Sequence, residues 1–268
     1  MLKGLSIVLS FVVLLVLFWA HFSRQGFERK AESERGRLLQ LGQSPASNPL
    51  PEALQRAVEL SGDLPSASQW VELQQEGHMR LKPDGPWIPF KANHLALVDR
   101  PGFVWCAEME MLPLVPVLVC DSYVEGRGRL EARIGGFITI AHEEGNDLAL
   151  GELFRYYAEL PWLPQGFAAQ QNAQWSQGPD GVQLLFEADG NRGEVRYRFN
   201  ALGQIDEVHA QRPNANVGGR KFPWTGRFSD YQDFGGLSLP AQGEVSWGLP
   251  GGEWTYWKGR IISVKFGP

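Results

Sequence analysis

Cysteine is scarce in this chain, because only Cys106 and Cys120 occur among its 268 residues. Two thiols exclude a disulfide-rich scaffold and a four-thiolate zinc site. Basic residues are also too few for a nucleic-acid binder, since 25 lysines and arginines against 30 aspartates and glutamates give a formal net charge of −5. The sequence contains no G-x-S-x-G, H-E-x-x-H, Walker or G-x-G-x-x-G pattern, so it predicts no metal site and no cofactor.

Glycine, proline and aromatic residues are, in contrast, abundant. The chain has 31 glycines and 18 prolines, both above their usual shares of about 7% and 5%. It also has 10 tryptophans and 15 phenylalanines. This composition indicates many turns that join short aromatic strands, and it argues against a helical bundle, a coiled coil and a disordered chain.

The longest apolar run covers residues 5–22. As a helix with a rise of about 1.5 Å per residue it would span about 27 Å, close to the ~30 Å hydrocarbon core of a bilayer. A cleavable signal peptide is the alternative, but no pair of small residues stands at suitable −3 and −1 positions. The sequence therefore predicts an uncleaved single-pass anchor through which the chain contacts the bilayer.

The organisation after this run follows from turn residues and from periodicity. Residues 1–42 are predicted to form the transmembrane anchor and a juxtamembrane helix, and residues 43–51, which are rich in serine, asparagine and proline, a linker. Residues 52–268 are predicted to form one domain. Within this domain, apolar spacing indicates helices over 52–60 and 148–160, the second capped by Asn146 or Asp147.

Alternation of apolar and charged residues predicts that most of the domain is antiparallel β-sheet. Leu130, Ala132 and Ile134 alternate with charged neighbours, as do the residues of 194–199. Further strands are expected at 87–98, 102–111, 116–124, 181–188, 203–211, 237–247 and 253–265. The predicted fold class is α+β, with one large curved antiparallel sheet, a half-open barrel, packed on one or two helices and preceded by the transmembrane helix.

Ordered segments of the chain resemble an uncharacterised bacterial family, a domain of unknown function of membrane-anchored envelope proteins, over about residues 70–265. The segments that carry the resemblance are 87–92, 103–107, 121–123, Gly126-x-Gly128, 155–159 with Trp162 and Pro164, and the closing Pro223-Trp224, Tyr231, Gly236, Pro240 and 244–247. At one position the chain departs from the pattern, with His94 in place of an expected glutamine.

The last third of the chain, with Phe199, Gly203, Ile205, Tyr231, Gly236 and Pro240, is also remotely similar in rhythm to periplasmic lipoprotein carriers of the LolA type. This resemblance implies a half-open antiparallel barrel around helices that holds acyl chains. Together the resemblances imply a location at the bacterial inner membrane. Basic residues flank the apolar run on both sides, so charge leaves the side of the membrane open; we favour the periplasm for the domain.

The two cysteines lie on consecutive predicted strands. If the hairpin is centred on Pro113, Cys106 and Cys120 face each other, and a disulfide could form in an oxidising compartment. The alternative, which we favour from the sequence, is two separate buried thiols.

One set of charged residues is enzyme-like. Asp121 lies on a predicted strand, and Arg155 and Glu159 share a face of the helix over 148–160. Two carboxylates in a cleft could divide acid and base roles. The structural interpretation, an i,i+4 ion pair between Arg155 and Glu159 with Asp121 bonded to a turn, is favoured, so no catalytic residue is predicted and these three are the alternative.

The aromatic residues give the leading functional hypothesis. Trp105, Tyr123, Tyr156 and Trp162 are the candidate ligand contacts, and Trp162, which follows Pro161, is expected at the mouth of the sheet or at the bilayer interface. We expect a membrane-tethered, non-enzymatic module that binds an apolar ligand such as a lipid or acyl chain. A protein-docking scaffold with an unspecified partner is the second hypothesis, and an envelope hydrolase with paired carboxylates the third.

Overall fold

The structure is a computed structural model. It describes the backbone of residues 2–268 apart from 44–46, 64–67, 113–114 and 215–219, and the side chains from residue 18 onward apart from those ranges and Leu112. The helices are α1 Leu2–Leu39, α2 Glu52–Ser61, α3 Asn146–Ala158, the 3-10 turn η1 Leu160–Trp162 and α4 Gly166–Ala169. The strands are β1 Trp70–Met79, β2 Ile88–Leu97, β3 Phe103–Leu112, β4 Val115–Val124, β5 Arg127–Ile134, β6 Ile138–Glu144, β7 Ala173–Gly178, β8 Gly181–Ala188, β9 Asn191–Phe199, β10 Ile205–Asn214, β11 Arg220–Asp233, β12 Ser238–Leu249 and β13 Gly252–Gly267.

All of these strands belong to one antiparallel sheet in the order β6-β5-β4-β3-β2-β1-β13-β12-β11-β10-β9-β8-β7. Each half of the chain is a meander of neighbouring hairpins, and the first strand pairs with the last, from Trp70 opposite Gly267 to Met79 opposite Trp257. The large curved antiparallel sheet with few helices, which the sequence predicts, is therefore confirmed.

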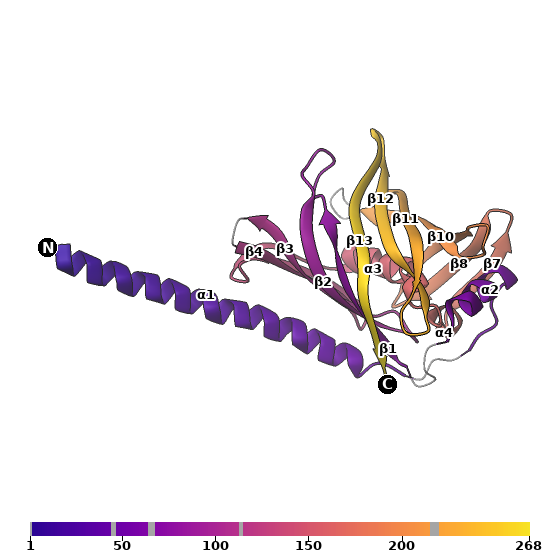
Figure 1. The fold of residues 1–268 in the computed structure, drawn as a ribbon, viewed down its shortest axis with the longest axis horizontal. Coiled ribbons are helices and arrows are strands. Elements are labelled where there is room, and N and C mark those ends of the chain that lie inside the picture. The colour runs from indigo at the N-terminus through magenta and orange to yellow at the C-terminus, as the bar shows by residue number, and fades with distance from the viewer. Residues whose placement is uncertain (1, 44–46, 64–67, 113–114, 215–219) are drawn as a thin grey trace.

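The two free edges of the sheet are joined by the helical segment α3-η1-α4. The chain leaves edge strand β6, crosses the concave face of the sheet and re-enters at the opposite edge, β7. Figure 1 shows α3 in the middle of the molecule, between the β2–β4 side and the β8–β10 side. The sheet is thus curled around a helix, and one contiguous core joins residues from both halves.

Helix α3 is buried on most of its sides because the sheet surrounds it. The apolar spacing predicts a buried stripe of Leu150, Leu153, Phe154 and Tyr157, and the last three are at most 2% exposed while Leu150 is half-buried. Phe154 packs edge-on against Phe186 of β8 with ring centroids 5.1 Å apart. One detail differs from the expectation: the helix begins after Gly145, and no side chain caps its first turn. Asp147 instead places a carboxylate near the positive end of the helix dipole.

The C-terminal half of α1 packs against the β-domain. Phe27 and Leu38 are buried, and Leu38 lies in a second small apolar cluster with residues of β2, β3 and β4 that point away from α3. Lys30 Nζ also lies 3.2 Å from Glu131 Oε2 on β5. The predicted juxtamembrane helix is thus in contact with the domain ahead of the predicted linker, because its apolar and basic side chains match this outer face.

The predicted span, residues 5–22, lies in α1, but the side chains of residues 5–17 are outside the described residues. Among the residues that are described, no helix combines the length and the apolar character needed to cross a bilayer. Phe18, Trp19 and Phe22 are exposed.

The cysteines form a disulfide, so the expectation of separate thiols is wrong. Cys106 and Cys120 are opposite each other in the β3–β4 register, their Cα atoms are 4.2 Å apart, and their sulfurs are bonded. Both lie on the outer face in the apolar cluster around Leu38. The antiparallel register, which brings the two side chains to one face of adjacent strands, is the physical reason that they can pair.

Removal of this bond by the pair of substitutions Cys106→Ala and Cys120→Ala is expected to lower the free energy of unfolding by about 2–3 kcal/mol, because the bond closes a loop of 14 residues in the unfolded chain. Urea unfolding of both proteins under non-reducing conditions measures the difference. Equal midpoints and slopes for the two proteins would contradict a stabilising bond.

Candidate functional site

The concave face of the sheet and α3 enclose a cavity of about 360 Å³, within the ~300–1,000 Å³ typical of small-molecule sites. Its walls are rich in aromatic side chains, namely Trp105, Trp162, Trp224, Phe228, Trp247, Trp254, Tyr256 and Trp257. Six of the chain's ten tryptophans thus line one cavity. Methionine, leucine and valine side chains complete the apolar part of the lining.

The cavity exists because small residues stand among the large ones on the strands that line it. Trp224, Gly226 and Phe228 alternate along β11 and line the cavity together. A Cβ built on Gly226 would lie 3.7 Å from Phe228 and 3.9 Å from Trp224, in ordinary van der Waals contact, so a Cβ fits beside these two rings without overlap. A Cβ built on Gly243 of β12 would be more crowded, 3.0 Å from Trp162 Cζ2.

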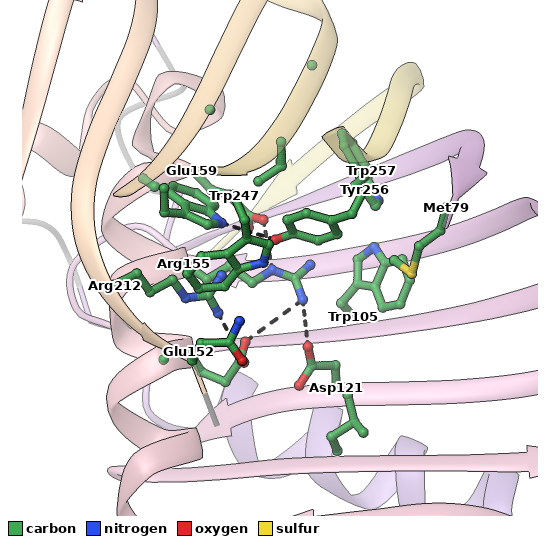
Figure 2. Close-up of a pocket in the computed structure, with 18 of the residues that line it drawn as sticks. Met79, Trp105, Asp121, Glu152, Arg155, Glu159, Arg212, Trp247, Tyr256 and Trp257 are labelled. Atoms are coloured by element: carbon green, nitrogen blue, oxygen red, sulfur yellow. Dashed lines mark hydrogen bonds and ion pairs between the residues drawn. The ribbon is translucent and has the colours of Figure 1, made fainter. Parts of the chain in front are cut away.

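A cluster of charged side chains lies at one side of the cavity, with Arg155 of α3 at its centre (Figure 2). Arg155 Nη1 donates to Asp121 Oδ2 of β4 at 2.8 Å, and Arg155 Nε donates to Glu159 Oε1 at 2.8 Å. The guanidinium also lies over the rings of Phe103 and Trp105, with centroid distances of 4.8 and 5.2 Å. Such cation–π contacts stabilise a desolvated guanidinium.

Glu152 of α3 links this centre to a second arginine, Arg212 of β10. Arg212 Nη2 lies 3.5 Å from Glu152 Oε1, and Arg155 Nη1 lies 3.9 Å from Glu152 Oε2. Arg212 in turn lies over Trp224 and Trp247, at 5.3 and 5.7 Å from their centroids. Three carboxyl groups and two guanidiniums therefore share one buried cluster.

Burial and charge move the pKa values of these carboxyl groups in different directions. For Asp121, burial raises the pKa well above its ordinary value, the neighbouring Glu152 raises it further, and the two arginines oppose this only in part. Burial likewise raises the pKa of Glu152. Burial also acts on Glu159, but Arg155 and then His94, whose Nε2 lies 3.1 Å from Glu159 Oε2, outweigh it and lower the pKa to about 2.

The structure divides the four predicted ligand contacts into two pairs. Trp105 and Trp162 line the cavity. Trp162 is 4% exposed, so the expectation that it reaches a mouth or a bilayer interface is corrected: its Nε1 donates to Pro240 O at 2.9 Å inside the core.

The other pair, Tyr123 and Tyr156, lies in the core away from the cavity lining. Tyr123 Oη donates to Asp189 Oδ2 at 2.7 Å and Tyr156 Oη donates to Leu97 O at 2.9 Å. These hydroxyls satisfy core hydrogen bonds because both rings are enclosed by the curled sheet. We therefore remove both tyrosines from the set of candidate ligand contacts.

The three residues of the enzyme-like set, Asp121, Arg155 and Glu159, are brought together as described above. Sequence reasoning missed Arg212 and His94 as members of the same cluster. Arg212 continues the buried face of Val208 and Ala210, and an arginine in phase with apolar residues was a signal that could have found it. Within the described ranges, no group of three or more His, Cys, Asp and Glu side chains is arranged to hold a metal ion.

Several solved structures are similar to this chain at low sequence identity. A LolA superfamily protein, NE2245 from Nitrosomonas europaea, has 12% identity and a TM-score of 0.43, with 81% of this chain and 92% of that chain covered. A putative outer membrane lipoprotein-sorting protein domain from Vibrio parahaemolyticus has 8% identity and a TM-score of 0.39, with coverage of 80% and 93%. A DUF1329 family protein from Desulfovibrio piger has 10% identity and a TM-score of 0.37, with coverage of 82% and 94%.

These similar structures include LolA-type proteins, which the last third of the sequence resembles. No curated protein matches the sequence of this chain. One family model matches residues 48–266, which contain all residues of the cavity and the described strands apart from Gly267 at the end of β13. The chain accordingly belongs to the family of unknown function DUF6920, as the resemblance of its ordered segments to an uncharacterised family predicted.

Proposed function

We propose that this protein is a non-enzymatic binding module for an amphipathic ligand, tethered to the bacterial inner membrane with its domain on the periplasmic side. The cavity of about 360 Å³ carries the proposal. It offers an aromatic wall for an apolar chain and a charged side for a polar group. Concave sites that are mostly apolar and have a few convergent polar groups are typical of small-molecule binding.

The sequence of the first helix supports the tether. Residues 5–22 form an apolar run of about the length needed for a bilayer. Phe27, the first buried contact of α1 with the domain, follows Phe22 by five residues, or about 7.5 Å along a helix. A span over residues 5–22 would therefore hold the β-domain close to the bilayer surface, where lipid-derived ligands are available.

Two other hypotheses are less well supported. A docking scaffold does not need a cavity of this kind. A hydrolase that uses Asp121 and Glu159 needs a free base, whereas the Glu159 oxygens lie against Arg155 and His94, and Asp121 Oδ2 accepts a hydrogen bond from Arg155. Carboxylates that are this well paired stabilise structure more readily than they accept a proton from a substrate.

Filling the cavity is expected to abolish ligand binding without unfolding the protein. Gly226→Leu places an apolar side chain in the cavity lining, where its Cβ would be in ordinary van der Waals contact with Phe228 and Trp224. We expect octan-1-ol, titrated against the full chain in lipid nanodiscs, to change tryptophan emission saturably, and Gly226→Leu to weaken this binding at least about tenfold. Empty nanodiscs correct for partition of octanol into lipid.

Gly178→Leu is the control, because Gly178 on β7 has no atom within 4 Å of a built Cβ and lies outside the cavity lining. It is expected to bind octanol like the unsubstituted chain. A chain that gives no saturable response, or one whose binding survives Gly226→Leu unchanged, would overturn the proposed use of this cavity.

A further inference from the structure

The charged groups that line the cavity are not balanced. Six carboxyl groups line it against four guanidiniums, namely Asp121, Glu143, Asp147, Glu152, Glu159 and Glu244 against Arg80, Arg155, Arg212 and Arg227. Glu143 and Asp147 are exposed and form no ion pair within the described part of the chain. Carboxyl groups therefore outnumber guanidiniums in the lining that an entering ligand meets.

Each guanidinium of the lining already has a partner, although Arg212 Nε is left without an acceptor among the described residues. Arg155 and Arg212 contact carboxylates of the cluster, Arg227 pairs with Glu253, and Arg80 donates to Thr255 O at 2.6 Å. An anionic ligand that displaced Arg155 or Arg212 from its carboxylate would leave that buried carboxylate uncompensated, which disfavours anion binding at the cluster.

Two carboxyl oxygens in the buried part of the site, in contrast, have no hydrogen-bond donor. Asp121 Oδ1 and Glu152 Oε2 are buried atoms without a hydrogen-bond partner among the described residues, on side chains that are 7% and 4% exposed as whole residues. Both residues line the cavity. Asp121 contacts Arg155 through its other oxygen, Oδ2, and Glu152 Oε2 lies 3.9 Å from Arg155 Nη1, beyond hydrogen-bond distance. A buried acceptor without a donor costs free energy, which a ligand that supplies N–H groups would recover.

We propose that the cavity binds a primary ammonium group carried on an apolar chain, with the ammonium donating to Asp121 Oδ1 and Glu152 Oε2. A primary ammonium has three N–H donors and no acceptor, and its positive charge complements the excess of carboxyl groups. The aromatic walls suit both the apolar chain and the cation. Two buried donors without partners, Arg212 Nε and Trp254 Nε1, would take an acceptor oxygen on the same ligand.

This inference rests on the proposed function and adds the chemical class of the ligand. Octylamine, octan-1-ol and octanoate share one chain and differ in the head group, so the test titrates each against the full chain in nanodiscs at pH 7 with tryptophan emission as the readout. Octylamine is expected to bind about tenfold or more tightly than octanol. Octanoate is expected to bind more weakly than octanol.

Asp121→Asn is expected to reduce the affinity for octylamine to about that for octanol while octanol binding is retained. Glu194→Gln is the control, because Glu194 is an exposed carboxylate on β9 outside the cavity, and it should leave the preference unchanged. Octanol binding as tight as octylamine binding, or tightest binding of octanoate, would overturn the inference while the proposed binding function stands. Failure of all three probes would overturn the proposed function itself.

Discussion

Glu159→Gln is expected to lower the free energy of unfolding at pH 7 by about 3–5 kcal/mol, whereas Asp121→Asn is expected to change it by less than about 1 kcal/mol. Both carboxyl groups accept a hydrogen bond from Arg155 at 2.8 Å. The pKa values of the two groups are shifted in opposite directions. Arg155 holds the pKa of Glu159 low, so the amide would remove a carboxylate that compensates the buried guanidinium. Burial raises the pKa of Asp121 well above its ordinary value, so the charged form of Asp121 contributes less to stability than that of Glu159.

The dependence on pH gives each variant a distinct signature. Glu159 has a pKa of about 2 in the folded protein against an ordinary value of 4.5, so its stabilisation is present above pH 4.5 and is lost as the pH falls toward 2. The difference between the unsubstituted chain and Glu159→Gln should therefore shrink in this range. The pKa of Asp121 is raised, so its protonated form favours folding at low pH, and Asp121→Asn should gain relative stability as the pH rises.

Urea unfolding of the full chain in nanodiscs at a series of pH values between 2.5 and 7, followed by near-ultraviolet circular dichroism, measures both differences. The two variants serve as controls for each other, since each replaces one carboxyl group that contacts Arg155. Equal losses of stability for the two variants at every pH would contradict the opposite pKa shifts of Asp121 and Glu159.

The sequence predicted several strands that have one buried and one exposed face, but not β1 or β11. In β9, Val195 and Tyr197 are buried and alternate with exposed charged residues, because α3 covers one side of this strand. The sequence did not predict β6, since this edge strand is exposed at nearly every residue from Ile138 to Glu144 and has no period of two. The pairing of β1 with β13 joins the two ends of the sheet, and no local pattern encodes such a long-range contact.

The candidate site was predictable only in part, for a related reason. The spacing of Arg155 and Glu159 along one helix is a local pattern, and the sequence placed both on one face. Arg212 joins them from β10 only because the sheet curls around α3. Tyr123 and Trp105 were equally good candidates from the sequence, and the direction of each ring within the curled sheet, which decides that only Trp105 reaches the cavity, is set by tertiary packing.

Gly128→Val is expected to lower the free energy of unfolding by about 3 kcal/mol or more and to abolish ligand binding. Gly128 lies on β5 at the point where the first turn of α3 rests on the sheet. A Cβ at this position would lie 2.6 Å from Ala149 N and 2.7 Å from Ala149 Cα. These are backbone atoms, so no rotamer change can relieve the overlap, and α3 itself would have to move away from the sheet.

Displacement of α3 would also disrupt the binding site, because α3 supplies Glu152, Arg155 and Glu159 to the cavity. Gly178→Val on β7 is the matched control: it introduces the same side chain on a strand where no atom lies within 4 Å of the Cβ, and stability and octanol binding should both be retained. Thermal unfolding and the tryptophan titration report the two effects separately. If Gly128→Val bound octanol with unchanged affinity, the close contact between β5 and α3 would not be what positions the charged side of the cavity.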